Sequence, residues 1–223
     1  MTRQIHPAPS LSWQRASTAN ATPQPWRNGG GQTRELLCWP VCADWVLRIS
    51  VAEITRDGAF SPYPGIDRWF AVLQGAGVRL LGGSHQPGGP LLPFRGEVAP
   101  DCALIDGPTR DFNFMHKRGR GRVTLLPATS PWSGAADWLG LFSITGGSVR
   151  GGQDSAELLQ LAPLELGWCR PGRTVDLQFA AATVAAAADQ GDHGDAAGGA
   201  ASADSSGLAR TSTGHWWLAW SAS

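Results

Sequence analysis

The chain has 223 residues, which is enough for one large or two small domains whose core needs no disulfide or metal. Eighteen basic and eighteen acidic residues give a formal net charge of zero, so no overall field attracts nucleic acid or anionic lipid. The longest apolar runs are far shorter than the roughly 20 residues of a membrane-spanning helix. We therefore expect no nucleic-acid partner and no membrane partner.

Two features of the composition indicate what the protein could recognise and in which redox compartment it works. Lys117 is the only lysine, so arginines dominate the basic residues, and their planar forks suit carboxylates. A bias in genomic base composition explains this excess equally well. The four cysteines show neither a CxxC pair nor a zinc-ribbon spacing, and no basic-then-apolar leader precedes them. We expect reduced, mostly buried thiols in a cytoplasmic protein.

The clearest predicted strand covers residues 45–51. Trp45, Leu47, Ile49 and Val51 share one face of this strand, so that face should join the core. Arg48 and Ser50 occupy the other face, which points either into a polar lumen or to water. The pattern does not choose between these two directions.

Later segments extend the all-β prediction, because 29 glycines and 16 prolines interrupt the chain every few residues. Residues 68–73 and 78–81 should form a hairpin across a glycine turn. Further strands are expected at 103–105, 112–115, 122–126, 139–144 and 175–179, a spacing typical of a barrel or sandwich. Residues 154–161 could form a short helix or a strand.

The C-terminal region combines two contrasting compositions. Residues 181–209 are mostly Ala, Gly, Asp and Ser, which predicts a flexible loop. The aromatic segment 215–220 follows and should pair back into a sheet across that loop.

Three motifs carry the functional prediction. Residues 25–35 contain Gly29, Gly30 and Gly31, which could leave N–H groups free to face an anion or could simply form a turn. Residues 57–68 form a proline-rich loop that leads into a strand opening with arginine. In residues 106–115 the side chains of Asp111, Asn113 and Met115 alternate onto one side of a strand.

These motifs resemble the signature of the HutD/Ves family, proteins associated with bacterial histidine utilisation and stress responses. The resemblance covers residues 25–115, roughly half of the chain. It implies one bicupin unit over 1–223, with an N-terminal cupin half at about 10–125 that carries the motifs. A C-terminal cupin half would follow at about 126–223. The family is thought to bind small carboxylates such as urocanate or formylglutamate and thereby to modulate histidine utilisation.

A carboxylate ligand needs a fixed cation and neutral donors, because burying an unpaired anion is costly. Arg68 and Arg48 are the candidate cations, although either could be a surface residue. Aromatic side chains near the loops could stack on a planar ligand, or they could belong to the core. The remaining predicted ligand-binding residues are Asn28, Ser50, Phe60, Ser61, Tyr63 and Asn113, and Phe112 is a further candidate for stacking.

The sequence gives no positive support for metal or nucleophilic catalysis. Cupin metal sites use a His-x-His pair, which is absent from the five scattered histidines. No Gly-x-Ser-x-Gly elbow, phosphate-binding loop or dinucleotide fingerprint occurs. The basic run 116–122 could bind phosphates, but a solvated turn is the simpler interpretation. We therefore expect no cofactor, no metal and no catalytic residue.

The leading hypothesis is a binding protein for a small carboxylate. A metal-independent enzyme, an isomerase or hydrolase using Asp111 or Glu35 as acid or base, is the first alternative. A protein-interaction module with the tryptophan-rich C-terminal strand as an exposed edge is the second. The sequence leaves a homodimer open.

Overall fold

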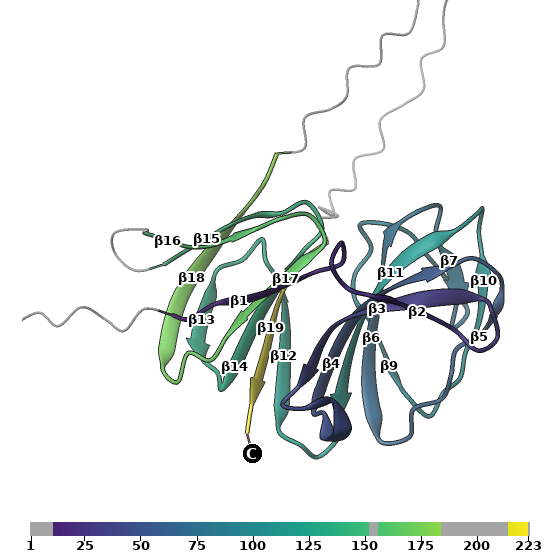
Figure 1. Ribbon diagram of the computed structural model, residues 1–223, viewed down its shortest axis with the longest axis horizontal. Helices are drawn as coiled ribbons and strands as arrows, with labels where there is room; N and C mark the ends of the chain where they lie inside the picture. Colours follow the sequence, from purple (N-terminus) through teal and green to yellow (C-terminus); the bar gives the residue numbers. More distant parts are fainter. Residues whose placement is uncertain (1–10, 152–155, 184–213, 223) are drawn as a thin grey trace, which may run out of the picture.

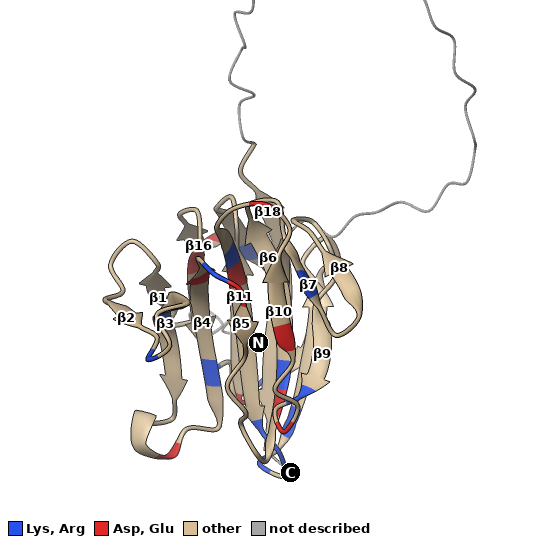
Figure 2. Ribbon diagram, turned by 90° about the vertical axis from the view of Figure 1, so that its right-hand side faces the viewer, with Lys and Arg blue, Asp and Glu red and all other residues tan. Residues whose placement is uncertain are grey.

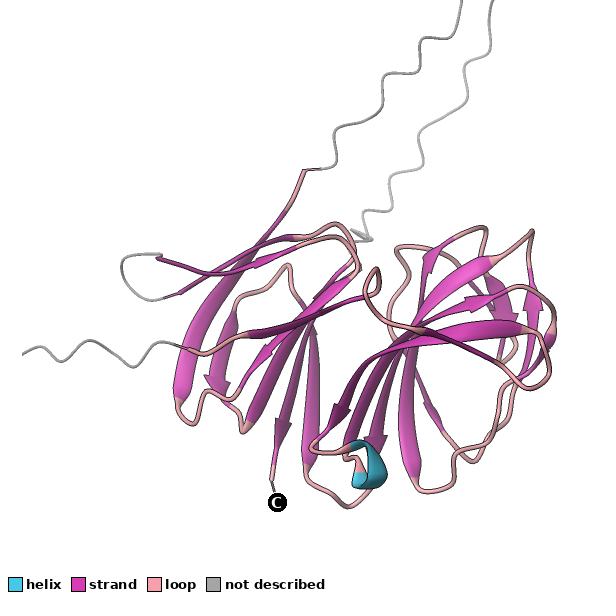
Figure 3. Ribbon diagram, viewed as in Figure 1, coloured by secondary structure: helices cyan, strands magenta, loops and turns pink. Residues whose placement is uncertain are grey.

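A computed structural model describes residues 11–151, 156–183 and 214–222, and in this part the protein is built almost wholly of strands (Figure 3). Nineteen strands and one short 3-10 helix, η1 (Cys42–Asp44), are present in these residues, and all the strand pairs described are antiparallel. No helix in this part of the chain is long and apolar enough to span a membrane. The loop expected at 181–209 lies, from residue 184 onward, outside the described residues.

Two sheets form the N-terminal half of the molecule (Figure 1). A six-stranded sheet has the order β2-β3-β4-β11-β6-β9. Its strands are β2 (Pro23–Pro25), β3 (Gly31–Trp39), β4 (Leu47–Ile54), β11 (Thr109–Lys117), β6 (Ile66–Gln74) and β9 (Leu92–Arg95). A four-stranded sheet covers one of its faces with the order β5 (Gly58–Ala59), β10 (Asp101–Leu104), β7 (Val78–Leu80) and β8 (Gly83–His85).

Two further sheets form the C-terminal half. A five-stranded sheet has the order β1 (Gln14–Ser17), β17 (Glu165–Cys169), β14 (Trp138–Ser143), β19 (His215–Ser221) and β12 (Arg122–Pro127). A four-stranded sheet has the order β13 (Trp132–Ala135), β18 (Thr174–Ala181), β15 (Gly147–Gly151) and β16 (Ala156–Leu161). Strand β1 therefore lies early in the chain but pairs with β17 of the C-terminal half, and β12, in the middle of the chain, pairs with β19 of the same sheet.

Three apolar clusters lie between the four sheets. One fills the space between the two N-terminal sheets, and a second fills the space between the two C-terminal sheets. The third and largest joins the six-stranded sheet to the five-stranded sheet. In this central cluster the ring of Phe112 lies 4.6 Å from that of Phe142 and 5.2 Å from that of Trp216, measured between centroids. The two halves thus share this central cluster, and each half has a further cluster of its own.

The alternation in β4 produces the predicted division of faces. Leu47, Ile49 and Val51 are buried in the central cluster, whereas Arg48 and Ser50 face the opposite way. The segment that could be helix or strand is the strand β16. The all-β prediction is confirmed. The hairpin expected from residues 68–73 and 78–81 is wrong, because β6 pairs with β11 and β9, whereas β7 pairs with β10 and β8 in the other N-terminal sheet. Each sheet described nevertheless ends in two edge strands, so closed barrels are not observed.

The aromatic segment at 215–220 pairs back into a sheet as expected, and the alternative in which it forms an exposed edge is wrong. β19 pairs with β14 on one side and β12 on the other, in the interior of its sheet. Trp216 and Trp217 are buried against two different clusters, because both faces of this sheet are covered. A near-continuous apolar run is typical of such a strand.

The basic run after β11 is neutralised locally. Arg118 contacts Asp67 at 3.0 Å and Glu97 at 2.9 Å, and Lys117 contacts Asp44 at 2.8 Å. Figure 2 shows acidic and basic residues interspersed over the strands of the face it presents. The run therefore forms a charge-paired turn.

Candidate ligand pocket

A cavity of about 540 Å³ lies on the face of the six-stranded sheet that is turned away from the central cluster. Cross-strand partners in antiparallel sheets share a face, so the strand register determines which side chains meet there. Met115 on β11 pairs with Arg48 on β4 and with Arg68 on β6. The next row along the sheet joins Asn113 to Ser50. A small organic ligand fits a cavity of this size.

The structure brings the predicted ligand-binding residues together. The cavity is lined by Asn28, Arg48, Ser50, Phe60, Ser61, Tyr63, Arg68 and Asn113. It is also lined by Trp26, Arg27, Thr33 and Met115, which were not among the predicted ligand-binding residues. The indole Nε1 of Trp26 donates to Thr33 Oγ1 at 2.8 Å, which joins the glycine loop to β3. Alternation along β3 could have indicated Thr33, and Trp26 lies within the motif at 25–35 that the sequence prediction had singled out.

Arg68 is a nearly buried cation, with 5% of its surface exposed. Its guanidinium donates to Asn113 Oδ1 at 3.0 Å and to the carbonyl of Ser61 at 3.4 Å, and both acceptors are neutral. Nε is buried without a hydrogen-bond partner. Desolvation lowers the pKa of Arg68 to about 10, which still leaves it charged at neutral pH.

Aromatic rings surround the Arg68 guanidinium. Its central carbon lies 5.2 Å from the ring centroid of Phe60, 5.4 Å from that of Tyr63 and 4.8 Å from that of Phe94. Such contacts favour the cation without neutralising it. Phe112, in contrast, is buried in the central cluster on the other face of β11, so the prediction that it could stack on a ligand is wrong.

Asp111 is the most buried ionisable group of the cavity, with 1% of its surface exposed. Burial raises its pKa to about 8, although nearby Arg68 and a hydrogen bond from Asn113 Nδ2 to Oδ1 act in the opposite direction. Its Oδ2 has no partner. Asp111 is therefore mostly a neutral carboxylic acid at pH 7, and it does not neutralise Arg68.

Arg48 differs from Arg68 because it already has a counter-ion. Its Nε lies 2.7 Å from Oε2 of Glu35, and its Nη1 donates to the Tyr63 hydroxyl at 3.5 Å. Burial raises the pKa of Glu35, but hydrogen bonds from Cys38 and Arg48 outweigh burial and the net pKa is lowered. The pair is ionised, and the charge of Arg48 is compensated.

The glycine loop at the mouth of the cavity forms a turn. Gly29 N–H donates to the carbonyl of Trp26 at 2.9 Å, and Gly30 N–H donates to the side chain of Asn28 at 3.0 Å. These N–H groups are satisfied within the loop, so they do not form an anion cradle. Of the two interpretations open at the sequence level, the turn is the correct one.

The three histidines in the described residues, His85, His116 and His215, lie outside the cavity lining. His85 contacts the carbonyl of Leu80, and His116 contacts that of Arg120. His215 lies 3.0 Å from the Ser143 hydroxyl in the C-terminal half. The other two histidines of the sequence lie outside the described residues.

Comparison with known proteins assigns the chain to a family. The model of the HutD family matches residues 18–187. The chain belongs to the HutD family. The resemblance to HutD/Ves proteins seen in the three motifs is thereby confirmed.

The HutD relatives include proteins of known sequence and of known structure. An uncharacterised 21.2 kDa protein in the hutC 3' region of Pseudomonas putida is 38% identical over 128 residues, 53% of this chain and 67% of that protein. Protein Ves of Cronobacter sakazakii is 38% identical over 112 residues, 46% of this chain and 60% of that protein. The alignments thus span only about two thirds, or less, of these relatives.

Two solved structures share the fold. A conserved protein of unknown function from Pseudomonas aeruginosa PAO1 has a TM-score of 0.65 and 26% identity, covering 76% of this chain and 92% of that chain. HutD from Pseudomonas fluorescens SBW25 has a TM-score of 0.60 and 24% identity, covering 77% of this chain and all of that chain.

Proposed function

We propose that the cavity binds a small carboxylate, with Arg68 as its counter-ion. The observation that carries the proposal is the charge balance of the described lining. Arg48 is paired with Glu35, Asp111 is mostly protonated at pH 7, and Arg68 contacts only neutral acceptors. Arg68 is therefore a buried positive charge without a counter-ion, and Arg27, an exposed residue of the same lining, adds a second positive charge. A carboxylate would supply the missing negative charge at Arg68.

The remaining lining favours a small planar or short-chain acid. Phe60 and Tyr63 provide ring surfaces beside the guanidinium, and Ser50, Ser61 and Asn28 provide neutral polar groups. Urocanate and formylglutamate are the ligands we propose to test first. The name of the Pseudomonas putida relative, which refers to a hut region, supports a role in modulating histidine utilisation.

We also propose a fold type and a cellular location for the protein. Each half would correspond to a cupin-type unit, which makes the chain a bicupin, and the protein would act in the cytoplasm. We still expect no nucleic-acid partner and no membrane partner, and a homodimer stays open.

The test is a ligand screen by thermal shift and calorimetry with urocanate, formylglutamate, histidine and glutamate. A ligand that binds only the folded state raises the melting temperature with concentration by mass action. In Arg68→Met the affinity should fall about tenfold to a hundredfold, because a hydrogen-bonded charge pair contributes about 1.5 to 3 kcal/mol. Arg79→Ala, on an exposed residue of β7, is the matched control and should bind normally.

Arg68→Met separates a binding defect from a folding defect. Replacing a buried charge with an apolar side chain of similar length is often neutral or stabilising, so the unliganded variant should melt no lower than the parent. Absence of binding of all four acids to the parent protein at millimolar concentration would remove the proposal. Equal affinity of the parent and Arg68→Met would also remove it.

A second candidate function is supported by Asp111. A carboxyl group with a raised pKa and a free oxygen, lying in a cavity, is suited to general acid catalysis. Glu35, the other candidate acid or base, is ionised and paired with Arg48. NMR of each acid incubated with the protein tests this function. Product that forms with the parent but not with Asp111→Asn would establish an enzyme, whereas unchanged substrate at high protein concentration would exclude this role for the acids tested.

A further inference from the structure

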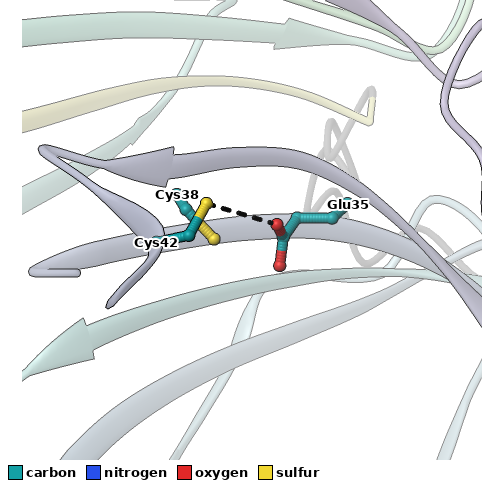
Figure 4. Close-up of side chains that lie close together, drawn as sticks. All are labelled: Glu35, Cys38 and Cys42. Carbon is teal, nitrogen blue, oxygen red and sulfur yellow. Dashed lines mark hydrogen bonds between the residues drawn. The ribbon is translucent and has the colours of Figure 1, made fainter. Parts of the chain in front are cut away.

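A second cluster of chemically active side chains lies beside the pocket. It consists of the Glu35 carboxylate, the Cys38 thiol and the Cys42 thiol (Figure 4). One oxygen or sulfur atom from each residue lies within 4.8 Å of the others. The Sγ of Cys42 lies 3.9 Å from Oε1 of Glu35. In Figure 4 both sulfur atoms and the carboxylate point toward a common space.

Two local features of the backbone build this cluster. A register shift between Glu35 and Leu37 pairs Glu35 with Ser50 and Cys38 with Arg48, which puts residues three apart on the same face. Such bulges redirect side chains, often near functional sites. The chain then reverses, and η1 brings Cys42 back beside β3. Consecutive alternation along a regular strand would have placed Glu35 and Cys38 on opposite faces.

The carboxylate of Glu35 contacts a cation and the thiols at the same time. Its Oε2 accepts from Arg48 at 2.7 Å, whereas its Oε1 faces the Cys42 thiol. One oxygen is therefore fixed by a cation while the other is directed toward the sulfur atoms. Carboxylates that bind metals are commonly oriented by such a second contact.

We propose that Glu35, Cys38 and Cys42 bind a thiophilic divalent cation of the zinc class, with a fourth position open to solvent or to a small ligand. Two thiolates and one carboxylate are a ligand set that zinc accepts. In tetrahedral coordination, bonds of about 2.0 to 2.3 Å to zinc place the ligand atoms about 3.3 to 3.8 Å apart. Small side-chain rotations bring the three atoms to that spacing. Hard cations such as magnesium and calcium prefer all-oxygen sites and would be rejected.

The charges balance when the cation is bound. Binding releases the two thiol protons to solvent, so the ligands carry three negative charges. The divalent cation and Arg48 together supply three positive charges. Without the cation, the pair of Glu35 and Arg48 carries no net charge. This site does not depend on the carboxylate-binding function of the pocket.

Cobalt(II) provides the test, because thiolate coordination gives it a charge-transfer band in the near ultraviolet. Tag-free, reduced and metal-stripped protein is titrated with cobalt, and zinc is then added in competition. We expect one cobalt per chain, a thiolate band, and displacement by zinc. Cys42→Ser and Cys38→Ser should each weaken binding at least tenfold, and Glu35→Gln should weaken it while preserving the thiolate band at high cobalt. Cys169→Ala, which removes a buried thiol of the C-terminal half, should leave binding unchanged.

Three results would overturn the proposal. The first is the absence of a thiolate band in the reduced parent protein. The second is an unchanged band in the double variant Cys38→Ser/Cys42→Ser, which would place the cobalt elsewhere. The third is a Cys38–Cys42 disulfide in protein purified without reductant, together with no cobalt binding after reduction, which would identify a redox pair instead. Melting temperatures of all variants establish that each one is folded.

Discussion

Replacing Asp111 with asparagine should stabilise the protein, and the gain should depend on pH. Burial raises the pKa of this carboxyl group from 3.8 to about 8. Below pH 3.8 the group is protonated in the folded and unfolded states alike. Between that pH and about 8 the unfolded chain has released the proton while the folded chain retains it, so the free energy of unfolding falls as pH rises. Asparagine has a similar shape but does not titrate, so the variant should not show this fall in the free energy of unfolding.

The size of the effect follows from the width of this interval. One pKa unit corresponds to about 1.4 kcal/mol, so the cost at pH 7 is roughly 4 kcal/mol. For a protein of this length that difference moves the melting temperature by on the order of 10 °C. Asparagine at position 111 can still accept the hydrogen bond from Asn113, so the contact itself is retained.

Thermal unfolding followed by circular dichroism, from about pH 5 to about pH 8.5, measures the effect. The gap between Asp111→Asn and the parent should widen with rising pH and level off near pH 8. Asp101→Asn, on an exposed residue of β10, should show no such trend. A gap that does not vary with pH, or a variant less stable than the parent at pH 8, would refute the reasoning.

Three further predictions concern stability and can be measured by urea denaturation. Phe112→Ala should lower the free energy of unfolding by about 3 to 5 kcal/mol, because it opens a cavity in the core that joins the halves; a loss below about 1 kcal/mol would contradict that role. Gly31→Ala should lower the free energy of unfolding by more than about 1 kcal/mol, since the added Cβ would lie 2.2 Å from the carbonyl oxygen of Glu53. An unchanged urea midpoint would show that the backbone moves to make room for the methyl group. Thr33→Val should cost about 1 kcal/mol by removing the acceptor of the Trp26 indole, and a neutral result would mean that this contact contributes nothing.

Much of the fold and of the pocket follows from alternation along single strands. The pattern of β4 separated Leu47 and Ile49 from Arg48, and the pattern of β11 placed Asp111 and Asn113 on one side. Alternation along a strand does not show what packs against each of its faces. Arg48 faces a cavity rather than water because a second sheet and the loop carrying Tyr63 lie across from it, and those contacts are made by residues distant in sequence.

Other features were missed because they depend on irregular backbone or on long-range pairing. The register shift after Glu35 has no sequence signal in a single chain, so the approach of Cys38 to Glu35 and Cys42 could not be foreseen. The cysteines were expected to be mostly buried, yet Cys42 is exposed and Cys38 is half-buried. The sequence also did not show that β1 pairs with β17, across the molecule from the strand that follows it.

β11 has one face in the shared core and the other in the pocket, which affects any attempt to produce one half of the protein alone. Phe112 and Phe114 belong to the shared core, while Asn113 between them belongs to the pocket. A fragment ending before β12 would keep every pocket strand from β3 to β11 but would expose the apolar back of the sheet. Such an exposed surface promotes aggregation. The C-terminal half thus covers the apolar back of the pocket sheet, and limited proteolysis between β11 and β12 should leave the two pieces associated.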